Sequence, residues 1–231
     1  MRIGVVADIH EPFGHPEYRR FCKDVFKSWK VDEVLFIGDI VDNHAISFHD
    51  HSPDGMSAID EIEAARHHIA KWHAQWPKAK VCIGNHCSRH YRLAYKAGLP
   101  AQYLKSYNQI FKTPGWKWKL EHRIEGVLYL HGTGISGKFA ALNTAIQKRT
   151  SLVMGHLHTW GGVLYHTNDT SRIFAMGVGA GIDVEAYAME YQKNFVVRPV
   201  LGAGVVIDGK KAFFEPMLIG RGEAYCRRKG Q

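Results

Sequence analysis

The sequence feature that most constrains the fold is a series of short apolar runs, each of which leads directly into glycine or polar residues. Short apolar runs that end in this way are typical of buried β-strands. Helical patterns at 17–30 and 57–76 lie between the early runs, so strands and helices alternate in the first part of the chain. The predicted strands occupy residues 3–7, 34–37, 81–83, 127–130 and 152–154.

The helix predicted at 57–76 has clear start and stop signals. Ser57 and Asp60 resemble a capping box, and Pro77 marks the end because proline cannot continue a helix. Apolar residues recur on one face of this helix, which predicts that the face packs against the core. They are Ile62, Ala65, Ile69, Trp72 and Trp76.

Beyond residue 154 the pattern is that of β-strands joined by turns. The predicted strands are 163–165, 172–176, 204–207 and 211–214. Asp208-Gly209 is a strong hairpin-turn signal between the last two. Alternating strands and helices followed by antiparallel strands predict an α/β fold, with sheet inside and helices outside.

The composition is that of an ordinary globular chain, because 45% of the 231 residues are hydrophobic and 23% are charged. No apolar run approaches the ~20 residues that a membrane span needs. We therefore expect one cytoplasmic domain over residues 1–231 that does not engage a membrane. We divide it into a motif-bearing part (1–160), a β-rich completion (161–220) and a flexible tail (221–231).

Cysteine, charge and histidine usage narrow the class of protein further. The four cysteines form no C-x-x-C pair, so neither a disulfide framework nor a thiolate zinc site is indicated. A formal net charge of +8 favours a polyanionic partner. The fifteen histidines are the stronger signal, because histidine is the commonest metal ligand and a frequent acid or base.

Residues suited to metal chemistry follow each of the first five predicted strands. The carboxyl ends of strands in an open α/β sheet converge on one crevice, so these groups are expected to meet although they span much of the chain. Glycines 38, 84 and 155 would permit tight turns and close backbone approach there. The candidate residues are Asp8, His10, Asp39, Asp42, Asn85, His86, His131, His156 and His158.

A site for two metal ions needs a carboxylate that can bridge, several imidazoles, and an oxygen ligand that leaves positions open for water and substrate. This set supplies all of them. Each motif alone is more simply a turn or a satisfied buried imidazole, so the specificity of the signal comes from finding all of them in order at predicted strand ends.

Together these motifs resemble the calcineurin-like metallophosphoesterases over residues 1 to about 160. The resemblance implies a four-layer αββα sandwich, with two mixed β-sheets inside and helices outside. It also implies two metal ions at the sheet ends, bridged by Asp39. One ion would be held by Asp8, His10, Asp39 and His158. The other would be held by Asp39, Asn85, His131 and His156.

The resemblance further places His86 against the scissile phosphate, with Asp42 orienting it. The sequence departs from the usual family pattern at two places. Cys87 stands where the family usually has an acidic residue, so the contribution of that carboxylate is missing or supplied elsewhere. Asn43-His44 follows Asp42 in place of the Arg-Gly of phosphoprotein phosphatases, which weighs against that branch.

The glycine-rich segment 132–139 imitates two nucleotide-binding motifs. As a P-loop it fails at Phe139, where magnesium needs Ser or Thr. As a dinucleotide fingerprint it lacks an acidic residue about 20 positions further on. We interpret it as a loop beside His131, where its backbone amides and Lys138 are candidates for contact with a substrate phosphate.

Segment 89–123 carries eight Lys or Arg residues and a single acid, interleaved with aromatic residues. This mixture is typical of nucleic-acid surfaces. The recurrence of Tyr103, Tyr107 and Phe111 every four residues equally predicts the buried face of a helix, and the two interpretations stay open. Arg89 and Arg92 follow His86 closely enough to be candidates for binding a phosphodiester.

Segment 44–51 adds three histidines, His44 first, directly after Asp42. We interpret it as a candidate substrate-binding loop rather than a third metal site.

These features predict an enzyme that hydrolyses phosphate esters by attack of a hydroxide held between two divalent metal ions. Mn²⁺ is the expected metal, with Fe, Zn²⁺ or Mg²⁺ as alternatives. The excess of basic over acidic residues and the basic, aromatic segment 89–123 favour a phosphodiester substrate such as DNA or RNA. The alternatives are a phosphomonoesterase and a nucleic-acid-binding module that retains the fold without turnover.

Overall fold

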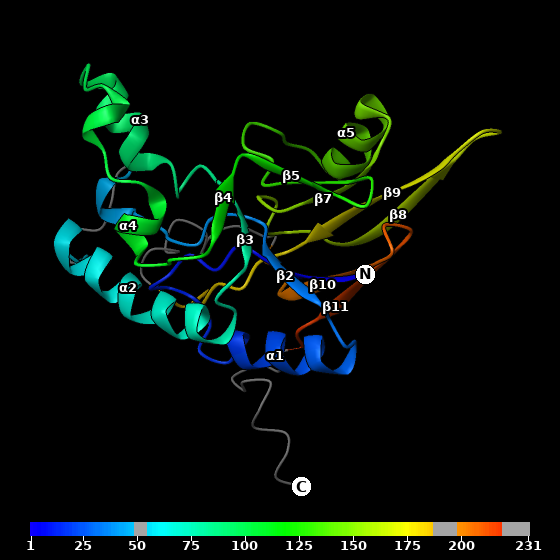
Figure 1. Cartoon of the computed structure of the whole chain (residues 1–231), viewed down its shortest axis with the longest axis horizontal. Coiled ribbons are helices and arrows are strands. Elements are labelled where there is room, and N and C mark those ends of the chain that lie inside the picture. The colour runs from blue at the N-terminus through cyan, green and yellow to red at the C-terminus, as the bar shows by residue number, and fades with distance from the viewer. Residues whose placement is uncertain (49–54, 187–197, 219–231) are drawn as a thin grey trace, which may run out of the picture.

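The computed structural model describes residues 1–48, 55–186 and 198–218 (Figure 1). In that part of the chain no helix is long and apolar enough to cross a membrane. The tail predicted at 221–231 and residues 49–51 of the predicted histidine loop lie outside the described residues.

The first sheet contains six strands, of which four are parallel. β1 pairs with β2, β2 with β3 and β3 with β4 in parallel, whereas β10 runs antiparallel to β1 and β11 antiparallel to β10. The order across the sheet is β11 (Lys211–Pro216), β10 (Gly202–Ile207), β1 (Arg2–Val6), β2 (Glu33–Phe36), β3 (Lys80–Cys82) and β4 (Lys117–Lys119). Two lysines on the edge strand β4 discourage pairing with another chain.

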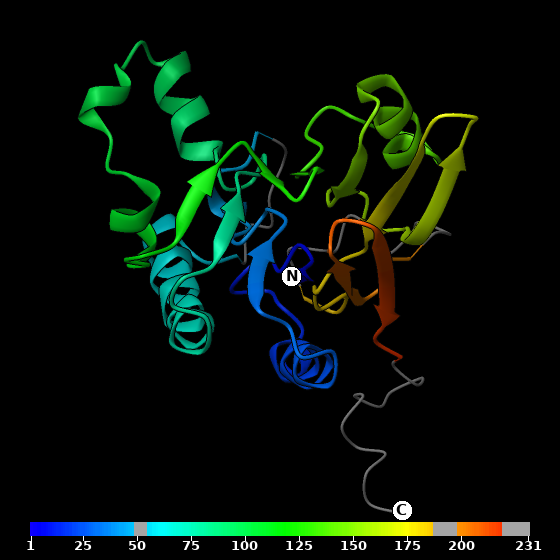
Figure 2. The same ribbon diagram turned by 45° about the vertical axis from the view of Figure 1, so that its right-hand side comes forward.

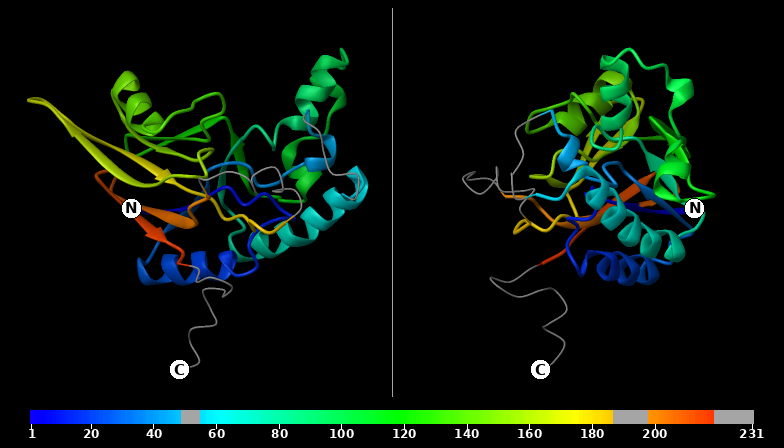
Figure 3. Two further views of the ribbon diagram at one scale, coloured as in Figure 1. Left: turned by 180° about the vertical axis from the view of Figure 1, so that it is seen from behind. Right: turned by 90° about the vertical axis from the view of Figure 1, so that its left-hand side faces the viewer.

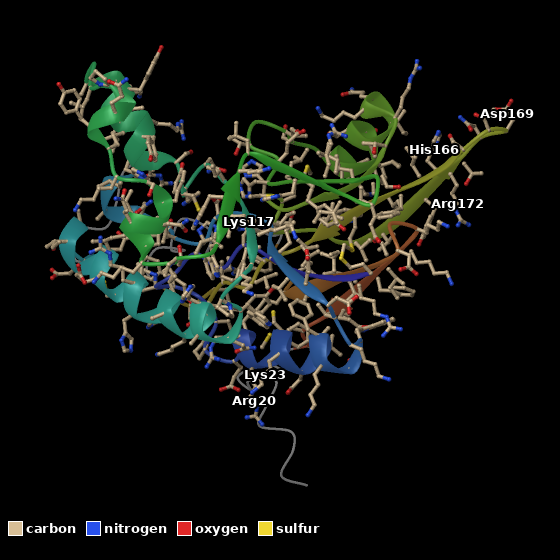
Figure 4. The ribbon with its side chains drawn as sticks, in the orientation of Figure 1. Arg20, Lys23, Lys117, His166, Asp169 and Arg172 are labelled. Atoms are coloured by element: carbon tan, nitrogen blue, oxygen red, sulfur yellow. The ribbon has the colours of Figure 1, made fainter. Side chains whose placement is uncertain are left out.

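The second sheet contains five strands around a parallel centre. β6, β7 and β9 are parallel neighbours, and β5 and β8 run antiparallel at the two edges. The order is β5 (Glu121–Ile124), β6 (Val127–Leu130), β7 (Ser151–Met154), β9 (Arg172–Val178) and β8 (Gly161–Thr167). The β8–β9 hairpin projects from the body, with His166 and Arg172 on its strands and Asp169 at its tip (Figure 4).

The alternation of side chains along β6 shows how the two sheets are layered. Val127 and Tyr129 belong to the large core shared with the first sheet. Leu128 and Leu130 point the other way and pack with Ala141 of α5 (Ala140–Lys148). Helices α1 (Tyr18–Ser28) and α2 (Ala58–Gln75) lie on the opposite side of the sandwich from α5 (Figure 2). The result is the predicted αββα arrangement.

The two long helices begin and pack as the sequence predicts. In α2 the Ser57 hydroxyl accepts the Asp60 N–H, and Ala65, Ile69 and Trp72 are buried. In α1 the exposed Arg20 and Lys23 lie on the solvent side (Figure 4). The buried face of α1 is made of Tyr18, Phe21, Cys22 and Phe26.

All nine predicted strands are present, and the Asp208-Gly209 turn joins β10 to β11 with both residues at positive φ. Strands β4 and β5 are absent from the sequence prediction, which treated that region only as basic and aromatic. The helical repeat predicted from Tyr103 to Phe111 is partly wrong. Only Tyr107–Phe111 is α-helical (α4), whereas Tyr103 ends a separate 3₁₀-helix, η2 (Ala101–Tyr103).

Tyr18 ties α1 to the first sheet and provides a test of the packing. Its buried hydroxyl accepts the Ala7 N–H at 3.0 Å and donates to the Gly202 carbonyl at 2.6 Å. Tyr18→Phe leaves both backbone groups unsatisfied, so we expect the free energy of unfolding to fall by about 1–3 kcal/mol in urea denaturation. The same substitution at the exposed Tyr103 is the control and should leave the midpoint unchanged. Equal midpoints for both variants would contradict this role of Tyr18.

Candidate metal centre

The carboxyl ends of β1, β2 and β3 in one sheet and of β6 and β7 in the other carry the site residues predicted from the sequence. Ligand atoms of these residues fall into three groups, and within each group they lie within 4.8 Å of one another. The groups are Asp8, His10 and His158; Asp39, His131 and His156; and His10, Asp42 and His86. The first two belong to the two predicted metal sites, and the third contains the predicted catalytic pair.

Asp39 lies between the two predicted metal sites. Its Oδ2 is 3.0 Å from His131 Nε2 on one side and 3.8 Å from His10 Nε2 on the other. Its Oδ1 accepts the backbone N–H of His86 at 2.8 Å. This position is the one that a bridging carboxylate requires.

The remaining predicted ligands complete the two groups. Asp8 Oδ2 lies 3.3 Å from His158 Nε2, on the side of the first predicted metal. Asn85 Oδ1 lies 3.0 Å from His131 Nε2, on the side of the second. The ring of His156 stands edge-on to that of His131, with 5.0 Å between their centroids. The structure thus brings together every residue that the sequence assigned to the two ions.

Several buried donor and acceptor atoms in this cluster have no hydrogen-bond partner among the residues that the structure describes. They are Asp8 Oδ1, both ring nitrogens of His10, and His131 Nδ1. Contacts such as the 3.6 Å between Asp8 Oδ1 and His131 Nδ1 are too long for a hydrogen bond. Leaving buried polar atoms unpaired is costly, and metal coordination would satisfy the Asp8 oxygen and one ring nitrogen of each histidine. The residues present therefore fit the metal pair that the sequence predicts.

The pKa values show how strongly the cluster attracts positive charge. Burial by itself would raise the pKa of Asp8 and of Asp39, but nearby imidazoles, that of His131 foremost, hold both below their usual range. Burial would lower the pKa of His131, yet the carboxylates of Asp39 and Asp8 raise it to about 10. A field that holds a proton this firmly also favours a divalent cation in its place.

The backbone at the site is held in conformations that side-chain-bearing residues rarely adopt. His10, Asp39 and His156 have φ values of 48°, 37° and 67°. Strain of this kind clusters at functional sites, where surrounding structure enforces it. Gly84 is required for a different reason, because a Cβ atom there would lie 2.0 Å from Asp39 Oδ1.

His86 and Asp42 form the pair that the sequence placed beside the metals. His86 Nδ1 lies 2.8 Å from both the Asp42 carboxylate and the Asp42 carbonyl oxygen, so Nδ1 carries the proton and Nε2 is directed away from Asp42. The side chain of His86 is 19% exposed, whereas that of Asp42 is buried. Burial would lower the pKa of His86, but Asp39 and Asp42 together raise it.

Arg89, a candidate phosphate-binding cation in the sequence, also has a structural role. It is buried, and its Nη1 donates to the carbonyls of Asp42 and Asn43 at 3.0 and 2.7 Å. Its Nη2 lies 3.4 Å from His86 Nε2. Arg89 therefore fixes the backbone that carries Asp42 and presents one edge of its guanidinium beside His86.

Glu61 is a residue of this site that the sequence analysis missed. Its buried carboxylate accepts the backbone N–H groups of His44 and Ala45, at the start of η1 (His44–Ile46), at 2.7 and 2.6 Å. The available signal was an acidic residue in helical register with the buried Ala65 and Ile69. Glu61 and Arg89 thus hold the segment after Asp42 from two different helices.

The other candidate substrate residues are Arg92, Lys138 and His44. The Arg92 guanidinium lies 4.8 Å from the ring centroid of Phe48, and Lys138 Nζ lies 5.5 Å from that of the exposed Phe139. His44 is anchored through its backbone to Glu61.

Cys87, which replaces the usual acidic residue, is fully buried and accepts the Ile40 N–H through Sγ at 3.2 Å. Burial raises the pKa of its thiol to about 12, so this position contributes a neutral packing group.

An α/β sandwich with carboxylates and imidazoles gathered at its strand ends in this way belongs to the metallophosphoesterase class. The family model described as calcineurin-like phosphoesterase matches residues 1–187, beyond the 160 residues over which the motifs are recognisable. The chain belongs to the calcineurin-like phosphoesterase family.

Solved structures with similar folds share little sequence with this chain. An archaeal phosphodiesterase is 14% identical, with 94% of this chain and 99% of the other covered and a TM-score of 0.48. A metallophosphoesterase from Sphaerobacter thermophilus is 15% identical, with 100% and 95% covered and a TM-score of 0.48. Zinc-complexed Vps29 from Entamoeba histolytica is 14% identical, with 95% and 94% covered and a TM-score of 0.45. No curated protein matches the sequence.

The geometry of Asp39 leads to a prediction about metal content. Asp39→Asn weakens the shared ligand of both sites, so we expect bound metal to fall by more than one equivalent per chain, with loss of activity. Asn85→Ala removes a ligand from the second site only and should reduce bound metal by one equivalent or less. Metal analysis of dialysed, metal-reconstituted protein measures both. Two full equivalents in Asp39→Asn, together with normal turnover, would show that the site is assigned wrongly.

Proposed function

We propose that this protein is a phosphodiesterase that uses two divalent metal ions. The observation that carries the proposal is the position of Asp39 between two groups of partly unsatisfied buried ligands, with His86 at their edge. Membership of the family supports hydrolysis of phosphate esters as the general activity.

In this proposal Asp8, His10, Asp39 and His158 hold one ion, and Asp39, Asn85, His131 and His156 hold the other. When bound, the metal pair supplies a water-derived nucleophile at neutral pH and neutralises charge on the phosphoryl oxygens. Oxygen and imidazole ligands without thiolate suit Mn²⁺, Fe, Zn²⁺ or Mg²⁺, and we expect Mn²⁺ to support activity. Cys82 and Cys87 are buried in the core and take no part.

His86 has the geometry of a proton donor to the leaving group. Its Nδ1–H donates a hydrogen bond to the Asp42 carboxylate, which leaves Nε2 to face the substrate. With a proton on Nε2 as well, His86 can stabilise and protonate a departing oxygen. Arg89, through its contacts with the Asp42 and Asn43 carbonyls, keeps this pair in place.

A diester is favoured over a monoester by the charges at the site. A phosphodiester carries one negative charge, whereas a monoester near neutral pH carries close to two and gains more from additional cations. Among the described residues, Arg89 is the arginine whose guanidinium contacts His86. Its Nη1 already donates to two backbone carbonyls, so only part of the guanidinium is left for a phosphate. The net charge of +8 adds long-range attraction for a polyanion such as DNA or RNA.

His86→Ala tests the proposed role of this histidine. We expect both metal equivalents to remain and kcat to fall by roughly 10²–10⁴-fold, the usual contribution of a positioned acid or base. His166→Ala, an exposed histidine on the distant β8–β9 hairpin, is the matched control and should behave like the wild type (Figure 4). Normal turnover in His86→Ala would remove this residue from the mechanism.

The substrate class is tested with metal-free protein to which single metals are restored. With Mn²⁺ we expect a higher kcat/KM for bis(4-nitrophenyl) phosphate than for 4-nitrophenyl phosphate, because the site neutralises one charge better than two. The reverse preference would make the protein a phosphomonoesterase. Absence of turnover with every metal, in protein that binds two equivalents, would indicate a binding module instead.

A further inference from the structure

The basic and aromatic segment 89–123 divides into two parts with different environments. Its inner part belongs to the core, because Tyr107 stacks on Trp118 at 4.9 Å and Phe111 is buried beside it. Its outer part is a projection formed by α3 (Arg89–Lys96) and η2, which we name the α3–η2 arm (residues 89–105) (Figures 1 and 3). The helical interpretation of the sequence is therefore correct for the inner part only.

The arm has a defined structure of its own. η2 packs against α3, and the Tyr91 hydroxyl donates to the Lys105 carbonyl at 2.9 Å, which joins the two limbs near their base. Ser106 then starts α4 with a capping box. A structure closed in this way can present side chains at fixed positions.

The outer surface of the arm presents large side chains to solvent. All residues from 95 to 103 are exposed, and the exposed fractions of Tyr95, Leu99 and Tyr103 are 85%, 43% and 76%. Exposed apolar and aromatic side chains gathered in one place mark interaction sites. Tyr95 lies on α3 and Tyr103 on the neighbouring η2, so two phenol rings are offered on adjacent elements.

The charge of the arm selects an anionic ligand. Residues 89–120 contain no aspartate or glutamate, and Arg92, Lys96 and Lys105 are exposed. Lys96 Nζ lies 4.1 Å and the Arg92 guanidinium 4.8 Å from the ring centroid of Phe48, so two cations of α3 lie over one aromatic ring. Cations interspersed with exposed aromatic faces suit a chain of phosphates that carries flat bases.

The arm also leads toward the metal centre. It begins three residues after His86, and the Nη2 of its first residue, Arg89, is 3.4 Å from His86 Nε2. A strand bound along the arm would therefore reach the site at the edge where His86 is exposed.

We propose that the α3–η2 arm binds single-stranded nucleic acid, with bases stacked on Tyr95 and Tyr103 and phosphates on Arg92, Lys96 and Lys105. In this role, which rests on the proposed phosphodiesterase function, the arm directs a phosphodiester of the bound strand to the metal centre. A single strand is specified rather than a duplex because the base faces of a duplex are already stacked on one another.

Binding is measured by fluorescence anisotropy with labelled 20-nucleotide DNA and RNA strands, on full-length metal-loaded protein in the His86→Ala background, which slows cleavage. We expect each single strand to bind more tightly than the corresponding duplex. The double variant Tyr95→Ala/Tyr103→Ala should lose roughly tenfold or more in affinity for the single strand, as removal of stacking rings does elsewhere. The control Tyr165→Ala, on the distant β8 strand, should bind as its parent.

The charges are tested through salt dependence. Lys96→Ala/Lys105→Ala should reduce the slope of log K against log salt by about one to two, because two phosphate contacts are lost. Lys23→Ala/Lys27→Ala removes equal charge from the exposed face of α1 and should leave the slope unchanged.

Turnover of bis(4-nitrophenyl) phosphate, measured with His86 intact, separates this proposal from the proposed function. Tyr95→Ala/Tyr103→Ala should leave that turnover unchanged, because a small diester does not need the arm. Two results would overturn the arm proposal alone, provided that small-diester turnover is normal. One is the absence of single-strand binding at low salt, and the other is binding that the arm variants do not weaken. Arm-dependent binding to anionic lipid vesicles in place of oligonucleotides also overturns it. Absence of small-diester turnover overturns the proposed function independently.

Discussion

The structure depends on the burial of two carboxylates at the junction of its sheets. Asp8, which follows β1, accepts the backbone N–H of His156 after β7 at 2.7 Å, and so joins the strand ends of the two sheets. Asp39 accepts the N–H of His86 after β3 and contacts the ring of His131 after β6. Buried carboxylates are stable only when they are paired, so imidazoles from both sheets must gather around them. The same requirement that holds the sheet ends together creates a site for cations.

Building this centre has a cost that the rest of the fold offsets. Left-handed backbone at His10, Asp39 and His156 costs on the order of 1 kcal/mol or more at each residue. The buried donor and acceptor atoms without hydrogen-bond partners among the described residues add to this free-energy cost until a cation is bound. The sandwich provides the opposing stabilisation, through a core that continues from α1 and α2 across the first sheet to the inner face of the second. Metal binding and folding are therefore expected to be coupled.

Elements outside the strand ends determine how the site works. Glu61 on α2 and Arg89 on α3 hold the backbone at and after Asp42 from two different helices, and through it the His86–Asp42 pair. Because α3 also begins the exposed arm, one short helix supports the proposed proton donor at its start and presents Tyr95 near its end. The position of the arm therefore follows directly from the geometry of the metal centre.

The sequence by itself determined the nine predicted strands and the two long helices, and it predicted the set of residues that gather at the candidate metal centre. Periodicity, capping and turn signals are local, and parallel strand ends in an α/β fold must converge. Only the tertiary structure decided that Arg89 is buried, that Glu61 binds the η1 backbone, and that Trp118 packs against the core while Tyr95 is exposed. Burial depends on which distant segments pack against a side chain, and local sequence does not specify that. The same limit explains the missed strands β4 and β5, whose pairing partners β3 and β6 define them.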